Sequence, residues 1–330
     1  MKKYTYIFIF LLIAVKLICQ DAQFTQFYAL PVYLNPAFTG LTNKHRFAVN
    51  YRNQWPGIKR GYTSYLASYD FNAGRFNSGI GGFVMQDVVG TSNLVNTQAG
   101  VNLAYKVKTG KNSEVRGGIT SAFCQEKIDN SKLLFNDQFI SGATVSQDAQ
   151  NIGTKNYLDL GLGVLYNSKK LWTGFSAKHI NKPNISLAGN NETLPVYFSA
   201  HAGYRFILQK PDTGKIIKSL SFAINYRHQL NNNQLDISTY YFYKFLNFGV
   251  SYRGLPFGKN KAGLVNNESV AIILGTEIPG KNLRISYSYD IIISGLSINS
   301  TAGAHEIIMV YEMGKEKKRI RKSATIRRKF

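Results

Sequence analysis

Residues 94–106 read Leu-Val-Asn-Thr-Gln-Ala-Gly-Val-Asn-Leu-Ala-Tyr-Lys and alternate almost without error between an apolar and a polar face. The apolar face carries Val95, Ala99, Val101, Leu103 and Tyr105, and the polar face carries Asn96, Gln98, Asn102 and Lys106. A period of two residues is typical of a β-strand that meets water on one side only. Similar segments recur along the whole chain with almost no helical pattern between them, which indicates a transmembrane β-barrel.

The same pattern predicts about 14 antiparallel strands, an even number of the kind expected when both ends of a single-chain bacterial barrel lie in the periplasm. We expect the apolar side chains to face lipid and the polar side chains to face the lumen. The predicted ranges are 46–55, 61–71, 79–87, 94–107, 115–127, 157–167, 170–180, 195–208, 217–229, 234–244, 245–254, 267–277, 282–292 and 304–313.

A water-soluble β-sandwich would also alternate, with its apolar face turned inward, so alternation alone does not decide between the two architectures. Tyr and Phe cluster near predicted strand ends, as in 240–245, where the aromatic girdles of a membrane barrel lie. The number of long strands also exceeds that of one ordinary sandwich. We therefore predict an all-β outer-membrane barrel, and we interpret Gly161 and Gly163 as residues that ease its curvature.

The N-terminal residues 1–19 have the pattern of a signal peptide, because Lys2 and Lys3 precede a short apolar run. We expect cleavage between Cys19 and Gln20, with a lipidated Cys19 as the alternative. No later segment approaches the length of apolar sequence that a membrane helix needs.

Three further regions follow the signal peptide. Residues 20–44 are polar and aromatic without a clean period, which predicts a periplasmic lead-in or a plug. Residues 45–313 are the predicted barrel, and residues 314–330 are a basic C-terminal tail. Cys124 falls among the residues of a polar face, where a lone cysteine is most often a small packing residue.

The chain carries 40 Lys and Arg against 18 Asp and Glu, a formal net charge of +22. Such a balance raises nucleic acid as a partner, but the positions of the charges argue against it. Nine of these basic residues lie between 315 and 329, and most others stand singly at strand ends or on polar faces. A basic tail can meet phosphate, lipid head groups or acidic protein, or can simply be solvated.

Two predicted connections are longer than ordinary hairpin loops, and loops of this size are often functional. With both termini in the periplasm, we expect the 128–156 loop on the outer side, after the fifth strand. We place the 181–194 loop in the periplasm, after the seventh strand, so that one is a lid and the other a docking element. On the first strand we expect Arg52 to pair with a carboxylate in the lumen, with Asp70 as a possible partner.

The sequence lacks the motifs of the common catalytic and metal sites. The five histidines show no paired metal-ligand spacing, and neither a nucleophile elbow nor a nucleotide-binding fingerprint followed by a helix is present. Barrels can be enzymes, and the ionisable groups of Asp70, Asp87, Asp290, His305 and Glu306 keep that alternative open. Because lumenal charges more commonly satisfy one another, we predict no enzyme, no cofactor and no metal.

Several ordered motifs at the two ends of the predicted mature chain resemble one family, the PorP/SprF membrane proteins of the type IX secretion system. Near the N-terminus they are Phe24-Thr25-Gln26-Phe27-Tyr28, Asn35-Pro36-Ala37-Phe38-Thr39-Gly40 and Tyr51-Arg52-Asn53-Gln54-Trp55. Near the C-terminus they are Tyr287-Ser288-Tyr289-Asp290 and Ser300-Thr301-Ala302-Gly303-Ala304-His305-Glu306-Ile307. The basic tail departs from this pattern.

The resemblance implies an outer-membrane location in a Gram-negative cell of the Bacteroidetes type and a role in exporting or holding large surface proteins, including gliding adhesins. Its partners would be a cargo protein with a C-terminal sorting domain, other type IX secretion components and outer-membrane lipid, with no nucleic acid. An outer-membrane porin or small-molecule transporter, which needs an open lumen, is the alternative. The candidate partner-binding residues carried by the motifs are Asn35, Pro36, Ala37, Gly40, Arg52, Gln54, Trp55, Asp290, His305 and Glu306.

Overall fold

The structure is a computed structural model, and it describes most of the chain between residues 21 and 313. The described ranges are 21–42, 45–59, 61–90, 93–129, 133, 136–142, 146, 153–209, 217–259, 265–295 and 298–313. The predicted signal peptide and basic tail lie outside the described residues, as does much of the 128–156 loop.

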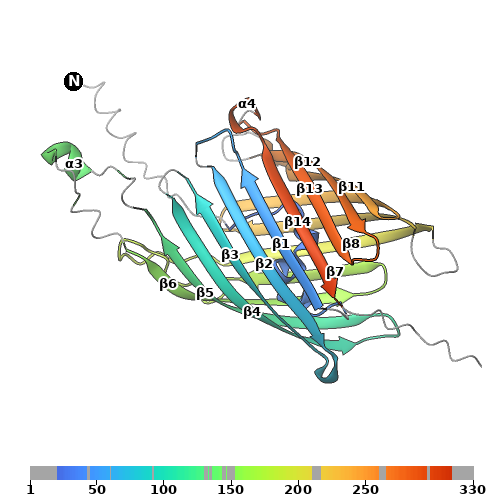
Figure 1. Cartoon of the computed structure of the whole chain (residues 1–330). Helices are drawn as coiled ribbons and strands as arrows, with labels where there is room; N and C mark the ends of the chain where they lie inside the picture. Colours follow the sequence, from blue (N-terminus) through green and yellow to red (C-terminus); the bar gives the residue numbers. More distant parts are fainter. Residues whose placement is uncertain are drawn as a thin grey trace, which may run out of the picture.

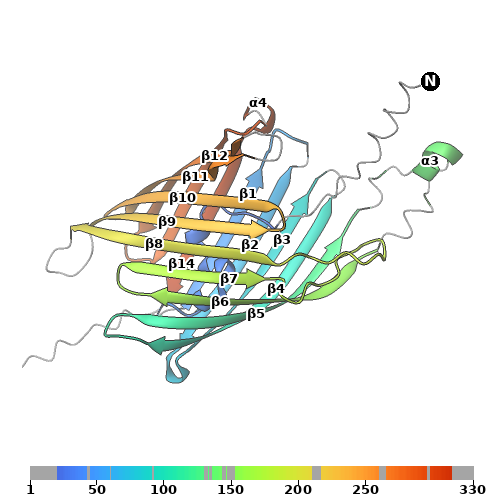
Figure 2. The ribbon, with the colours of Figure 1, turned by 180° about the vertical axis from the view of Figure 1, so that it is seen from behind.

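Fourteen antiparallel strands of the described chain form one closed barrel, in which each strand pairs with its neighbours in sequence and the first pairs with the last (Figures 1 and 2). This confirms the predicted fold class and strand number. The strands are β1 (His45–Gln54), β2 (Tyr62–Ala73), β3 (Ser78–Val89), β4 (Leu94–Lys108), β5 (Glu114–Lys127), β6 (Lys155–Asn167), β7 (Leu171–Lys178), β8 (Tyr197–Gln209), β9 (Lys218–Gln229), β10 (Asn232–Tyr243), β11 (Leu246–Lys259), β12 (Val265–Ile278), β13 (Leu283–Ile292) and β14 (Ala304–Met313).

The wall of the barrel has its apolar face outward. In β4, Val101 and Leu103 are 62% and 50% exposed, whereas Asn102 between them is fully buried. A soluble sandwich would show the opposite arrangement, because its apolar face would form the core. The exposed apolar side chains therefore face lipid, as predicted, and the soluble alternative is rejected.

The helices of the structure are short, and none of those described is long and apolar enough to cross a membrane. They are the 3₁₀ turns η1 (Phe27–Ala29), η2 (Pro36–Phe38) and η3 (Gly74–Phe76) and the α-helical turns α2 (Pro31–Leu34), α3 (Asn136–Ser141) and α4 (Ile298–Thr301).

Residues 21–41, here called the lumenal segment, run lengthwise through the inside of the barrel, where they form the dark blue coil in Figures 1 and 2. At one end Asp21 bonds to His179, directly after β7, and at the other Gly40 bonds to Asp70 near the end of β2. Its middle is made of η1, α2 and η2, and nearly all of its residues from Phe24 to Gly40 are buried. The segment crosses the lumen once before the chain enters the wall at β1.

Glycines on the inner face of the wall leave room for the lumenal segment. A Cβ atom at Gly118 would lie 2.4 Å from the backbone nitrogen of Ala37, and one at Gly163 would lie 2.0 Å from the Asn35 side chain. Real Cβ atoms do not approach other atoms so closely. Gly163 therefore permits close packing against the segment, and the interpretation of Gly161 and Gly163 as residues that ease barrel curvature stays a prediction.

The long connections of the barrel lie at the end where the odd-numbered strands finish. The backbone amide of Gly153, before β6, donates to the carbonyl of Leu187, after β7, over 3.2 Å, so the 128–156 and 181–194 loops meet. The placement of these two loops at opposite ends was therefore wrong, because every odd-numbered strand ends on the same side. Short turns are periplasmic and longer loops extracellular in such barrels, which defines the outer and periplasmic ends used below.

We expect Gly118→Val to destabilise the barrel by about 2 kcal/mol or more, because the added side chain collides with the backbone of the lumenal segment. The matched control is Gly117→Val, since a Cβ atom at Gly117 has no atom within 4 Å. Urea unfolding of the refolded proteins in detergent micelles measures the difference. Equal stability of the two variants would contradict the close packing described here.

Candidate functional site

A cluster of buried charges joins the closing strands of the barrel to the lumenal segment. Arg52 of β1 bonds to Asp290 of β13 over 2.8 Å and to Glu306 of β14 over 3.1 Å. Thr25 of the lumenal segment donates its hydroxyl to Asp290 over 2.7 Å and its backbone amide to Glu306 over 2.7 Å. Arg253 of β11 donates to the Thr25 hydroxyl over 3.0 Å. We call these five residues the lumenal ion cluster.

The carboxylates of the lumenal ion cluster are fully buried, and neighbouring groups complete their hydrogen bonding. Glu306 also accepts from the Asn50 side chain over 3.0 Å and from the Gln26 backbone amide over 3.1 Å. Charges removed from water are stable only when they are paired and hydrogen-bonded in this way. The cluster therefore holds Thr25 and Gln26 against the closing strands.

The register of the closing pair brings the cluster together. Arg52 lies directly opposite Glu306 in the ladder that joins β1 to β14, so the barrel closes on this ion pair. Asp70 is not the partner of Arg52, which corrects our expectation. Asp70 instead faces Arg46 across the β1–β2 ladder and binds its guanidinium over 2.8 Å.

Asn35 and Pro36 form a tight turn at the centre of the lumenal segment. The Asn35 side-chain oxygen accepts from the Ala37 amide over 2.8 Å, which caps η2, and Pro36 occupies the first position of that turn. The side-chain nitrogen of Asn35, Nδ2, donates to the carbonyls of Val164 in β6 and Phe175 in β7 over 3.0 and 3.1 Å. One side chain thus shapes the turn and attaches it to the wall.

The opposite side of the same turn is held by Arg116 of β5, which is 1% exposed. Its guanidinium donates to the carbonyl oxygens of Ala37, over 2.8 Å, and Thr39. Gly40 then turns the chain with a φ of 66°, in the left-handed region that suits glycine, and its amide donates to Asp70 over 2.8 Å. The motif between Asn35 and Gly40 is therefore anchored to the wall along its length.

At the outer end, the first described residue of the lumenal segment is held by a histidine. His179 lies 3.0 Å from Asp21 and 2.9 Å from Asp159 of β6, and its side chain is 2% exposed. Burial alone would lower the pKa of His179, but the Asp21 carboxylate and the hydrogen bonds to both acids raise it to about 9. The pKa of Asp21 is lowered against the opposing effect of burial, chiefly by His179.

Three of the predicted site residues do not join these contacts. Gln54 accepts only a long bond of 3.5 Å from Arg52, and Trp55 forms the turn after β1 with a φ of 61°. His305 lies on the outer face of the wall, where its ring bonds to the hydroxyl of Tyr287 over 2.7 Å. The other seven lie in the lumen, in the segment from Asn35 to Gly40 or in the ion cluster.

Sequence reasoning missed several residues that hold the lumenal segment, since isolated polar residues, whether on a strand or outside one, carry no local signal of their partner. They are Asp21, Thr25, Arg116, His179, His201 and Arg253. Thr25 could have been predicted, because it lies in the motif of residues 24–28, before the Asn-Pro turn. Within the described residues, no group of three or more His, Cys, Asp and Glu side chains is arranged to hold a metal ion. The site residues therefore hold the buried lumenal segment against the barrel wall.

Comparison with known proteins identifies relatives at the level of family and fold. The family model described as "Type IX secretion system membrane protein PorP/SprF" matches residues 17–311. Among solved structures, the chain resembles the outer membrane protein Omp33 of Acinetobacter baumannii at 8% identity and a TM-score of 0.45, covering 82% of this chain and 99% of that chain.

Two hydrocarbon channels have a similar likeness. The toluene transporter TodX of P. putida is 10% identical with a TM-score of 0.48, covering 86% of this chain and 93% of that one. The CymD monoaromatic hydrocarbon channel is 11% identical with a TM-score of 0.47, covering 90% and 95%. These likenesses concern the barrel fold alone. No curated protein matches the sequence.

We expect Glu306→Ala to lower the free energy of unfolding by about 3–5 kcal/mol, because it leaves Arg52 buried without one of its partners. The control is Glu312→Ala, which removes the partner of Arg284, a guanidinium that is 52% exposed at 2.7 Å from the carboxylate. That exposed pair contributes about 1 kcal/mol or less. Urea titration in detergent micelles compares the two losses, and similar losses would show that the cluster does not hold the barrel together.

The bond between His179 and Asp21 predicts a loss of stability in alkali. The pKa of His179 is raised from 6.5 to about 9. Its contribution to the free energy of unfolding is therefore complete below pH 6.5 and disappears as the pH rises through 9. We expect the wild-type protein to be more stable than His179→Gln by about 3 kcal/mol near pH 6 and no more stable above about pH 10. Thermal unfolding of both proteins at the two pH values measures this, and a constant difference would refute it.

Proposed function

Because the chain belongs to the PorP/SprF family of type IX secretion system membrane proteins and is an outer-membrane β-barrel, we propose that it supports the secretion or surface attachment of a partner protein. The partner is a cargo protein that carries a C-terminal sorting domain, such as a gliding adhesin. The barrel anchors this cargo at the outer face of the membrane, in association with other type IX secretion components.

The occupied lumen is the observation that carries this proposal against the porin or small-molecule transporter. A barrel of 14 strands is wide enough for an aqueous channel unless something fills it. Here the lumenal segment contacts the wall at several heights, at Asp21, Thr25, Asn35 and Gly40. A segment anchored in this way suits a plug. It also suits a rigid anchoring protein that binds its partner through its loops.

The outer end offers a surface for the cargo. Helix α3, in the connection between β5 and β6, exposes Phe139 and Ile140 to 73% and 87%, and Figure 1 shows it standing away from the barrel. Large apolar side chains exposed outside the lipid-facing band point to a protein contact. The loop after β7 meets the same connection through Leu187 and Gly153, so the two long loops form one surface.

Affinity purification of the tagged protein from detergent-solubilised outer membranes, followed by mass spectrometry, tests the proposal. We expect one large surface protein with a C-terminal sorting domain, and about tenfold less of it with the double variant Phe139→Ser and Ile140→Ser. Removal of exposed apolar anchors at the centre of an interface costs a factor of this order.

The matched control is Phe76→Ser, because Phe76 is 70% exposed in a turn at the periplasmic end. We expect this variant to recover the surface protein as the wild type does. Recovery of the barrel without any surface protein would contradict the anchoring role. Equal recovery by the α3 variant would contradict the assignment of the docking surface to α3.

A further inference from the structure

The periplasmic end of the lumen contains two adjoining cavities of about 300 and 420 Å³. Tyr28 and Pro31 of the lumenal segment line both of them, together with Arg46, Arg205 and Phe242 of the wall. We call the joined space the vestibule. Cavities of this size are typical of sites that bind ligands.

Basic side chains from separate elements surround the vestibule. They are Arg46 of β1, Lys169 and Lys170 of the β6–β7 turn, Arg205 of β8, Lys244 of the β10–β11 turn and Arg284 of β13. Arg46 is neutralised by Asp70, and Arg284 by Glu312. In the part of the chain that the structure describes, the other four form no ion pair with a carboxylate. Glu277 is the remaining acidic residue that lines the space.

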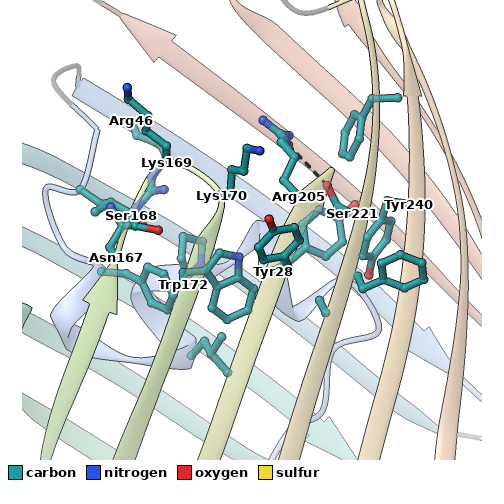
Figure 3. A pocket seen from close by; sticks show the side chains of 18 residues that line it. Tyr28, Arg46, Asn167, Ser168, Lys169, Lys170, Trp172, Arg205, Ser221 and Tyr240 are labelled. Atoms are coloured by element: carbon teal, nitrogen blue, oxygen red, sulfur yellow. Dashed lines mark hydrogen bonds between the residues drawn. The ribbon is translucent and has the colours of Figure 1, made fainter. Parts of the chain in front are cut away.

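Lys170 and Arg205 lie next to each other on the rim, and the backbone amide of Arg205 donates to the carbonyl of Lys170 over 2.8 Å. Figure 3 shows both side chains on the same side of the pocket, with Trp172 and Tyr28 drawn below them. The Arg205 guanidinium also lies 5.1 Å from the centre of the Phe242 ring. The cavity of about 300 Å³, which the Lys170 and Arg205 side chains line, has cations and apolar rings but no acid among its described lining residues, and such a space concentrates anions.

From this arrangement we propose that the vestibule binds an acidic, aromatic-containing peptide segment of a protein that approaches the barrel from the periplasm. The four cations without an ion pair stand on three different elements, so a ligand with several spaced carboxylates neutralises them together, whereas one carboxylate does not. The apolar floor, made of Leu34, Phe38, Trp172 and Phe242, accepts an aromatic side chain between those carboxylates.

The location of the charges selects a peptide over the membrane surface. Lys170 and Arg205 face the lumen, whereas lipid head groups meet the outside of the wall. The chain leaves β14 at Met313 on this same end, and the sequence that follows carries nine Lys and Arg between 315 and 329. This inference concerns the end of the barrel opposite to the cargo surface, so it stands or falls separately from the proposed function.

Fluorescence anisotropy with the full-length protein in detergent micelles tests the inference. The probe is a short labelled peptide in which Asp and Glu alternate with Phe and Tyr, and the comparison probe has Asn and Gln in place of the acids. We expect saturable binding of the acidic probe alone, weakened as salt is added. The double variant Lys170→Glu and Arg205→Glu lowers its affinity about tenfold or more, and the milder Lys170→Gln and Arg205→Gln lowers it less.

The control is the double variant Lys59→Glu and Lys182→Glu, which makes the same change in net charge with two exposed lysines at the outer end. It retains wild-type affinity if the vestibule is the site. The inference is overturned if the vestibule variants bind like the wild type, or if both probes bind equally. It is also overturned if replacing the Lys and Arg of 315–329 by Gln abolishes binding while the vestibule variants retain it, because the tail would then be the site.

Discussion

The burial of charge at the seam of the barrel is the constraint on which the structure depends. Arg52 and Glu306 face each other where the first and last strands close the sheet, and both side chains are buried. Buried ions need a complete set of partners, and the wall supplies only part of it. Thr25 and the Gln26 amide supply further partners for the two carboxylates, so closure of the barrel and the position of the lumenal segment are coupled.

This coupling explains why the conspicuous motifs lie at the two ends of the barrel sequence. Arg52 belongs to the first strand, and Asp290 and Glu306 belong to the last two, so residues far apart in the chain meet at one seam. The Asn-Pro turn meets a second requirement, because the helical turns of the lumenal segment are short and leave backbone groups that need partners inside the lumen. Asn35 and Arg116 provide them by bonding across to the wall.

The alternation of polar and apolar residues, together with the aromatic clusters at strand ends and the number of long strands, was sufficient to predict the fold, since lipid outside and a polar lumen inside impose a period of two. The alternation predicted that Arg52 faces the lumen, but it did not predict its partner. Asp70 and Glu306 also face inward, on the two different strands that pair with β1. The path of the lumenal segment was beyond prediction. Its hydrogen bonds to the wall join residues from 27 to 281 positions apart, and no local period predicts them.

The lumenal segment lies inside the barrel and the two long loops meet at its outer end, an arrangement that suits a division of the proposed functions between the two ends. The outer loops suit the cargo of the proposed anchoring role, and the basic vestibule suits a periplasmic partner. We propose that the lumenal segment closes the lumen. Planar-bilayer recording of the purified protein tests this most directly: we expect no steady conductance from the wild type and frequent openings from Asp290→Asn, which weakens the hold on Thr25. A steady open-channel conductance from the wild type, unchanged in the variant, would contradict the closed lumen.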